Sequence, residues 1–227
     1  MTSDSASMEP MEWAKYVLRN RNERGYPEAY SILIREARAG NHDAEYYLGL
    51  VYARGQGVIK DYKAARSWFE KAYLHGHSGS AYYLGKIYLT GLGVSKDVVR
   101  AEMLFRKAAD SNDPRAEYEL GLIYFMGDTI GRDLNESFKW MERSANGGHM
   151  EAQFVLGQYY KTGCGVEVDM SKSVDWLVSA AISKHRGAQI LLGNMYRSGD
   201  GVPADSTEAD RWYDMAQVDT HRCRDHA

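Results

Sequence analysis

Hydrophobic residues recur along the chain at helical spacing, and the pattern itself returns at a fixed longer interval. Ala44, Leu48, Val51 and Tyr52 fall within one arc of roughly 100° on a helical wheel, which predicts a helix with one buried face. The phrase Leu-Gly-x-x-Tyr in this helix occurs five times, with its glycine at positions 49, 85, 121, 157 and 193. This constant interval of 36 residues predicts an array of helical repeats instead of one globular core.

A second amphipathic stretch follows in every repeat. A small residue, as at Ala65, is followed three positions later by a large one and four positions further by another small one, as at Ala72. This spacing predicts a second helix whose large side chain is buried between closely packed helices. The large residues are Trp68, Leu104, Trp140, Trp176 and Trp212.

Glycine and aspartate punctuate the two helices. Glycine pairs such as Gly55 and Gly57 end the first helix and predict left-handed C-terminal caps. The third repeat departs from this pattern, because its second glycine is displaced to Gly131, and its turn is expected to differ in shape. An aspartate precedes each second helix, and an N-cap explains all five better than a metal site or catalysis does. These are Asp61, Asp97, Asp133, Asp169 and Asp205.

The repeats leave two ends to explain. Residues 1–10 are predicted to be disordered, and residues 11–43 to form capping helices over Met11–Arg21 and Glu28–Ala39. Residues 217–227 are expected to form a disordered tail. The five repeats between them are assigned to residues 44–79, 80–115, 116–151, 152–187 and 188–216.

Composition narrows the function classes. The 227 residues carry a net charge of −3 with both signs interspersed, which gives no indication of nucleic-acid binding. No apolar run is long enough to insert into a membrane and the N-terminus lacks a signal-peptide pattern, so a cytoplasmic protein is expected unless a non-classical route exports it. Cys164 and Cys223 have no motif spacing and are expected to be free thiols.

The combination of Leu-Gly-x-x-Tyr, a Gly-x-Gly-Val turn with an aspartate, and Ala-x-x-Trp-Phe-x-Lys-Ala over Ala65–Ala72 resembles the Sel1-like repeat. This family belongs to the tetratricopeptide-like superfamily. The resemblance covers residues 44–216 and implies an all-α, right-handed α-solenoid superhelix that acts as an adaptor or scaffold for a protein or peptide. It also leaves open a secreted effector that binds a host protein. Cysteine-rich members have been linked to β-lactamase activity, but this chain lacks their cysteine pattern, so a related hydrolase is the weaker alternative.

The resemblance implies that the first helices line a concave surface, and their outward positions predict where a partner binds. An aromatic column and the residues four and seven positions after it would form the floor, apolar in the first three repeats and polar or basic in the last two. Core packing is an open alternative for the aromatic column. The candidates are Tyr46, Tyr82, Lys86, Leu89, Tyr118, Leu122, Phe125, Met126, Phe154, Gln158, Lys161, Asn194 and Arg197.

Motifs for chemistry are missing from the sequence. It contains no phosphate-binding loop, dinucleotide fingerprint, nucleophile elbow or His-Glu-x-x-His motif, so no catalytic, cofactor or metal site is assigned and a non-enzymatic role is predicted. His77, His149 and His185 recur at the turns between repeats and are interpreted as turn residues. A monomer is expected, or a weak homodimer formed through the N-terminal cap or the tail.

Overall fold

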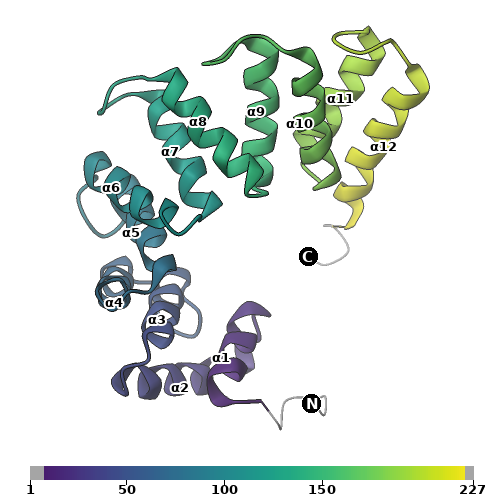
Figure 1. Cartoon of the computed structure of the whole chain (residues 1–227). Coiled ribbons are helices and arrows are strands. Elements are labelled where there is room, and N and C mark those ends of the chain that lie inside the picture. The colour runs from purple at the N-terminus through teal and green to yellow at the C-terminus, as the bar shows by residue number, and fades with distance from the viewer. Residues whose placement is uncertain (1–7, 223–227) are drawn as a thin grey trace. The chain divides into compact units, whose positions relative to one another are not determined.

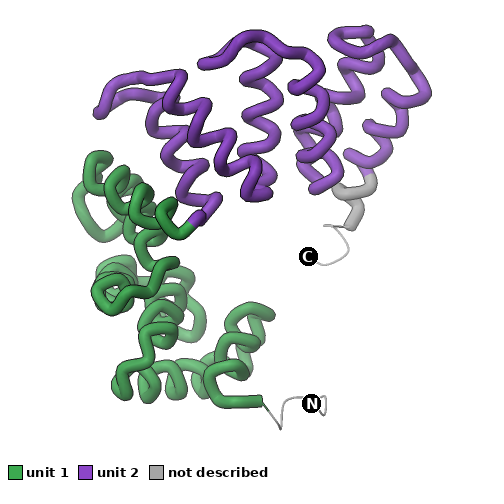
Figure 2. The backbone as a smooth tube through the Cα atoms, viewed as in Figure 1, with its two compact units in different colours: residues 1–111 green, residues 112–227 purple. Residues whose placement is uncertain are grey.

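The computed structural model describes the backbone of residues 8–222, and all regular secondary structure in this range is helical (Figure 1). The predicted all-α fold of helix-turn-helix repeats is therefore confirmed. The chain divides into two compact units, residues 1–111 and 112–227 (Figure 2), and each is considered by itself. The expected disorder over residues 1–7 and 223–227 lies outside the described residues.

Over residues 8–111, the first unit contains six α-helices and a short 3-10 helix, η2 (Glu23–Gly25). The α-helices are α1 (Pro10–Arg19), α2 (Tyr26–Arg38), α3 (His42–Arg54), α4 (Tyr62–Leu74), α5 (Ser78–Thr90) and α6 (Val98–Ala109). The second unit contains α7 (Pro114–Met126), α8 (Leu134–Asn146), α9 (Met150–Thr162), α10 (Met170–Ile182), α11 (Arg186–Ser198) and α12 (Ser206–Arg222). In both units each second helix packs against its own first helix and, within the unit, against the next first helix.

The first helices begin two residues earlier than the hydrophobic pattern indicated, because the residues at the turns act as N-caps. The Oδ1 of Asn41 accepts from the Ala44 amide at 3.3 Å, and the Nδ1 atoms of His149 and His185 accept from backbone amides three residues later. Asp113 caps α7 in the same way. The turn histidines are therefore part of the helix starts.

All five predicted aspartate N-caps are confirmed. Asp61 accepts from the amides of Lys63 and Ala64 at 2.8 and 3.1 Å. Asp97, Asp133, Asp169 and Asp205 each accept from at least one amide in the first turn of the following helix. These carboxylates satisfy donors that have no partner within the helix.

The glycine turns are also confirmed as left-handed caps, with Gly55 at φ 70° and its counterparts in the other repeats between 68° and 77°. The second glycine of the pair lets the loop approach the start of the preceding second helix. A Cβ on Gly165 would lie 2.0 Å from the Leu134 carbonyl oxygen. The third repeat differs as expected, because its second left-handed glycine is Gly131, at φ 85°, and a Cβ there would meet no atom within 4 Å.

In the first four helix pairs the fully buried large residue lies one position after the one that the pattern indicated, at Phe69, Phe105, Met141 and Leu177. Of the predicted large residues, Trp140 and Trp212 are buried, whereas Trp68, beneath the ammonium of Lys71, is only partly buried, as are Leu104 and Trp176. The mid-helix glycine faces the fully buried side chain. A Cβ on Gly49 would lie 2.5 Å from the Phe69 ring, so a large side chain approaches the glycine closely. A glycine is therefore required where the ring meets helix α3.

The two ends complete the array. Helices α1 and α2 share a core with α3 that includes Val17, Leu33 and Leu48, so they cover the first repeat as capping helices. Tyr26, the first residue of α2, lies one 36-residue period before Tyr62, the first residue of α4. Helix α2 therefore corresponds to the second helix of a repeat. At the other end α12 continues to Arg222, so the predicted tail is helical over its first six residues, 217–222.

Candidate functional site

The predicted partner-binding residues are divided between the two units. Tyr46, Tyr82, Lys86 and Leu89 lie on α3 and α5 of the first unit, and the remaining nine lie on α7, α9 and α11 of the second. All of them therefore lie on first helices, as predicted. A floor that continues from one unit into the other stays a prediction.

The aromatic column packs between repeats. Tyr46 stacks on His77 with ring centroids 4.2 Å apart, and Phe154 stacks on His185 at the same distance. Tyr118 stacks on His149 at 4.7 Å. Each of these histidines belongs to the first helix of the next repeat. Burial lowers the pKa of both His77 and His149. A lowered pKa favours the neutral ring, which in His149 accepts the capping hydrogen bond from the Ala152 amide.

Tyr82 departs from this arrangement because Asp113 stands where the next histidine would be. Its ring instead meets the edge of Tyr83 at 5.1 Å and tilts toward Phe105 at 6.0 Å. The aromatic column is thus half-buried throughout and takes part in packing. Core packing, the alternative to partner binding, is therefore the main role that the structure gives to these side chains.

Two apolar candidates of the third repeat are also partly used by the fold. Leu122 and Phe125 pack against the buried cluster that contains Met141 and Leu156. Phe125 stacks on Tyr159 at 6.0 Å, and the Arg132 guanidinium lies 5.2 Å from the centre of the Phe125 ring. Packing in the core is therefore sufficient to explain why both positions are apolar, and both side chains remain partly exposed.

Three candidates of the second unit are exposed. Met126 is 66% exposed at the end of α7, and Asn194 and Arg197 lie exposed on α11. Asn194 accepts a hydrogen bond from the Tyr213 hydroxyl at 2.7 Å, and Arg197 pairs with Asp210 at 2.8 Å. Lys161, which is partly buried, pairs with Asp200. Exposed ion pairs contribute little to stability, so these groups can exchange their partners.

A groove of about 680 Å³ lies beside Arg197, between α11 and α12. Ile190 provides an apolar wall, while Arg186, Asp210 and Asp214 supply charges of both signs. The sequence pattern predicted Arg197 as a binding residue but did not predict that α12 contributes to the groove. The groove depends on how α12 packs against α11, and the spacing of residues within one helix does not indicate this. The first unit has a pocket of the same volume, about 680 Å³, lined by Arg21, Tyr26 and Lys60 among others, and one of about 200 Å³ lined by Leu18, Tyr46 and Tyr83 among others.

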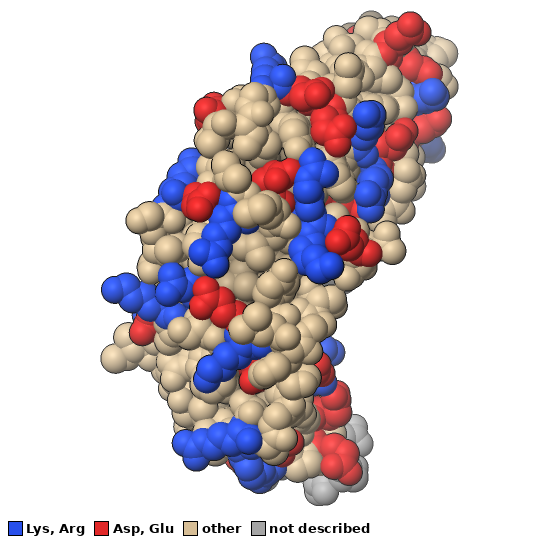
Figure 3. All heavy atoms as spheres, turned by 60° about the vertical axis from the view of Figure 1, so that its left-hand side comes forward, with Lys and Arg blue, Asp and Glu red and all other residues tan. Residues whose placement is uncertain are grey.

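Charged side chains of both signs occur along the face shown in Figure 3. This distribution agrees with the net charge of −3 from 28 basic and 31 acidic residues. A partner of that face would be recognised by individual pairs and apolar contacts, since a mixed surface produces no strong long-range field.

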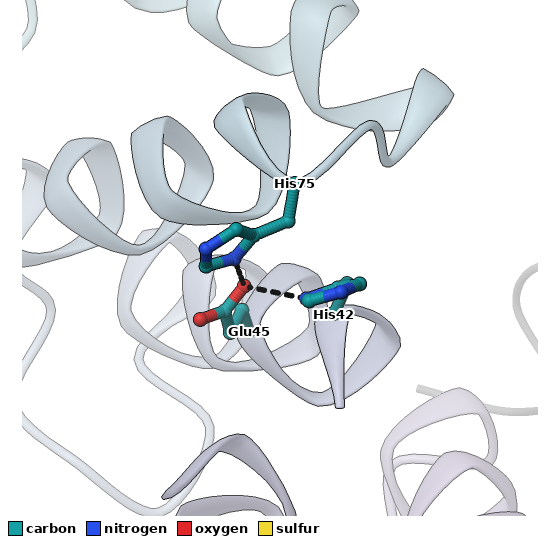
Figure 4. Close-up of side chains that lie close together, drawn as sticks. All are labelled: His42, Glu45 and His75. Atoms are coloured by element: carbon teal, nitrogen blue, oxygen red, sulfur yellow. Dashed lines mark hydrogen bonds and ion pairs between the residues drawn. The ribbon is translucent and has the colours of Figure 1, made fainter. Parts of the chain in front are cut away.

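A cluster of metal-ligating side chains in the first unit was not predicted. Glu45 on α3 lies between the imidazoles of His42, at the start of the same helix, and His75, at the end of α4 (Figure 4). The Oε2 atom of Glu45 is 2.8 Å from Nδ1 of His75 and 3.5 Å from Nδ1 of His42. The His42–Glu45 spacing of one helical turn was the available signal, but His75 is 30 residues away in sequence.

The fold defines a helical-repeat solenoid, and comparison with known proteins assigns its family. The Sel1 repeat model matches residues 42–77, 78–113, 114–149, 151–185 and 187–216. The chain therefore belongs to the Sel1 repeat family, as its sequence predicted. The first three matched repeats begin at the first residues of α3, α5 and α7, and the last two begin one residue after the starts of α9 and α11.

Solved structures agree with this assignment. A Sel1 repeat protein from Oxalobacter formigenes is 27% identical with a TM-score of 0.80, over 94% of this chain and 84% of that one. The protein c5321, a protective antigen present in uropathogenic Escherichia coli strains, is 30% identical with a TM-score of 0.82, and the match covers 92% of this chain and 45% of that one. The immunity protein Pa5087 from Pseudomonas aeruginosa, at 21% identity and a TM-score of 0.52 over 77% of this chain and 64% of that one, shares the fold. No curated protein sequence matches the chain.

Sel1 repeat proteins are generally scaffolds for protein interaction and are typically non-catalytic. Within residues 8–222, no helix combines the length and the apolar character needed to cross a bilayer. The coarse functional class is thus given by the family.

Proposed function

We propose that this protein is a non-enzymatic interaction module that binds a protein or peptide through the outward face of its first helices. The observation that carries the proposal is that, within each repeat, the recurring residues serve the fold and the variable residues are exposed. The periodic residues are buried or cap helices, as Leu48, Phe69 and Asp61 do. The outward positions of the first helices differ from repeat to repeat and retain exposed side chains, including Met126, Asn194 and Arg197.

In the second unit the proposed contact combines an apolar and a charged part. Met126 offers a flexible apolar side chain at the end of α7. Arg197 lies at the groove between α11 and α12, where a carboxylate of the partner could replace Asp210 in a bidentate pair. The proposed ligand is accordingly a segment with an apolar anchor and an acidic residue.

The proposal is tested by affinity capture from a cell extract followed by mass spectrometry, comparing the native chain with two double variants. Met126→Glu with Arg197→Glu should reduce recovery of the partner at least about tenfold, since losing one apolar anchor and one charged contact removes 2 kcal/mol or more. The control, Ile182→Glu with Lys139→Glu, makes the same change in charge at exposed positions of the second helices α10 and α8.

Recovery of the same partner by the first double variant, with its helical circular dichroism unchanged, would refute the proposed face. Equal loss in both variants would show that charge and not position governs capture. Retention in the control together with loss in the first variant supports the proposal.

A further inference from the structure

We infer that the first repeat binds a divalent transition-metal ion, of which Zn²⁺ is the best fit, through His42, Glu45 and His75. Among the described residues these three side chains form the one group of His, Cys, Asp or Glu that could hold a metal, and one donor atom from each lies within 4.8 Å of the others. Two imidazoles and one carboxylate are a donor set that binds zinc and leaves a fourth position open.

The fold places the three donors without distortion. His42 and Glu45 lie three residues apart on the first turn of α3 and share one face of that helix. His75 is the C-cap residue of α4, which returns antiparallel to α3, so its ring lies beside that of His42 with centroids 4.4 Å apart. The cluster therefore joins the start of one helix to the end of its partner.

The spacing suits four-coordinate zinc. Bonds of about 2.0–2.1 Å at tetrahedral angles separate neighbouring donors by about 3.3 Å. The observed separations from Glu45 Oε2, 2.8 Å to His75 Nδ1 and 3.5 Å to His42 Nδ1, bracket this value. All three donor atoms lie within 4.8 Å of one another. Side-chain shifts that bring the two imidazole nitrogens closer, by up to about 1.5 Å, would complete the geometry.

Burial and charge give the cluster a reason to hold a cation. The Glu45 side chain is only 6% exposed, and a buried carboxylate requires a compensating charge. Glu45 Oε2 lies within hydrogen-bond distance of His75 Nδ1, at 2.8 Å, and a bound cation would take the place of the proton between them. The equivalent carboxylate of the third repeat, Glu117, is compensated by the Arg143 guanidinium at 2.8 Å, whereas the first repeat offers two imidazoles in the same role.

The other repeats lack the two histidines at these positions. The second repeat has Ser78, Ala81 and Ser111 at the three positions. In the fourth and fifth repeats, Gln153 and Gln189 donate to the carbonyl oxygens of Ala145 and Ala181 at the end of the preceding helix. The same buried position thus accepts a neutral amide, an Arg-paired carboxylate or, in the first repeat alone, a complete ligand set.

Access to the site is open. The side chains of His42 and His75 are 46% and 48% exposed, so an ion can enter and the fourth ligand can be water or a donor from another molecule. A bound ion would fasten the N-terminus of α3 to the C-terminus of α4.

The test titrates ZnCl₂ into the metal-free full-length protein in competition with a chromophoric chelator at neutral pH. The tail residues His221, Cys223 and His226 are replaced by serine in all samples, so that they cannot contribute ligands. One ion per chain is expected. Glu45→Gln, His42→Ala and His75→Gln should each weaken binding at least about tenfold, because loss of even an outer-sphere partner costs ten- to hundredfold.

The matched control is His185→Asn. His185 pairs with Glu151 at 3.0 Å and caps a helix, but it lacks a third ligand, so its replacement should leave zinc affinity unchanged. Zinc binding that survives in all three ligand variants, or the absence of stoichiometric binding, overturns the inference.

A second measurement needs no variant and decides the matter if any of them fails to fold. Zinc should protect His42 and His75 of the native chain from diethylpyrocarbonate, which acylates free imidazole nitrogen, while His149 and His185 keep their rates. Peptide mass spectrometry reads each histidine separately. Equal modification of His42 and His75 with and without zinc would contradict the site.

Discussion

Replacing Gly49 with alanine should destabilise the first repeat although alanine is the better helix former. The new Cβ would lie 2.5 Å and 2.6 Å from two ring carbons of Phe69, well inside van der Waals contact. The ring cannot easily retreat, because Phe69 is fully buried and stacks on Tyr83 of the next repeat with centroids 5.1 Å apart and planes at 8°. The clash must therefore be relieved by moving helices.

The magnitude follows from two opposing effects. Overpacking a well-packed core costs about 1–3 kcal/mol, and a ring held on its far side belongs at the upper end. Alanine in place of glycine within a helix returns about 1 kcal/mol. The free energy of unfolding of Gly49→Ala should thus fall by about 2 kcal/mol, measured by urea denaturation followed by far-ultraviolet circular dichroism.

A double-mutant cycle isolates the contact. Phe69→Leu should relieve Gly49→Ala, so that the pair costs less than the sum of the single changes, whereas Phe105→Leu, which faces Gly85, should add independently. The reasoning fails if Gly49→Ala is as stable as the native chain, or if both leucine variants couple to it equally.

Three further outcomes are expected. Asp133→Ala should lower the free energy of unfolding by about 1 kcal/mol in thermal denaturation, with Asp133→Asn close to native, because the side chain caps α8. Burial raises the pKa of Glu117 above its ordinary 4.5, so the folded protein keeps the proton to a higher pH than the unfolded chain does. The stability that the protonated Glu117 contributes is therefore lost as the pH rises above 4.5 and through the pKa of the folded protein. Glu117→Gln should accordingly gain stability relative to the native chain between about pH 4 and 7 in urea titrations, and a constant difference would contradict this sign. His149→Asn keeps a helix cap but loses the stack on Tyr118, and should cost about 0.5–1.5 kcal/mol by thermal melting, with no loss expected if the stack is incidental.

The repeat architecture could be predicted from sequence because its signals are local and repeated. Asp61 and Gly55 act within a few residues of their own position, through a capping carboxylate and a left-handed φ, and each signal occurs in five copies. Local chemistry of this kind does not depend on how distant elements pack.

The predictions were less accurate where neighbouring helices decide the outcome. The pattern identified Trp68 as the central core residue, but the orientation of α4 against α3 places Phe69 there. The stacking of Tyr46 on His77 depends on the start of the next repeat, which periodicity alone does not place. The His75 ligand likewise reaches Glu45 only because α4 returns along α3.

The close contact between a glycine loop and the preceding repeat limits which insertions and deletions the chain can accept. Gly57 meets Tyr26, and Gly93 meets Tyr62, one period later in both partners, so the first two repeats of the first unit share one form of junction. Duplication or loss of a whole 36-residue repeat there preserves this junction, whereas an insertion of a few residues before Gly93 breaks it. The family's chains should therefore lengthen and shorten in whole units, and recombination between repeats offers this protein an evolutionary route to new partners that point mutation of its turns does not.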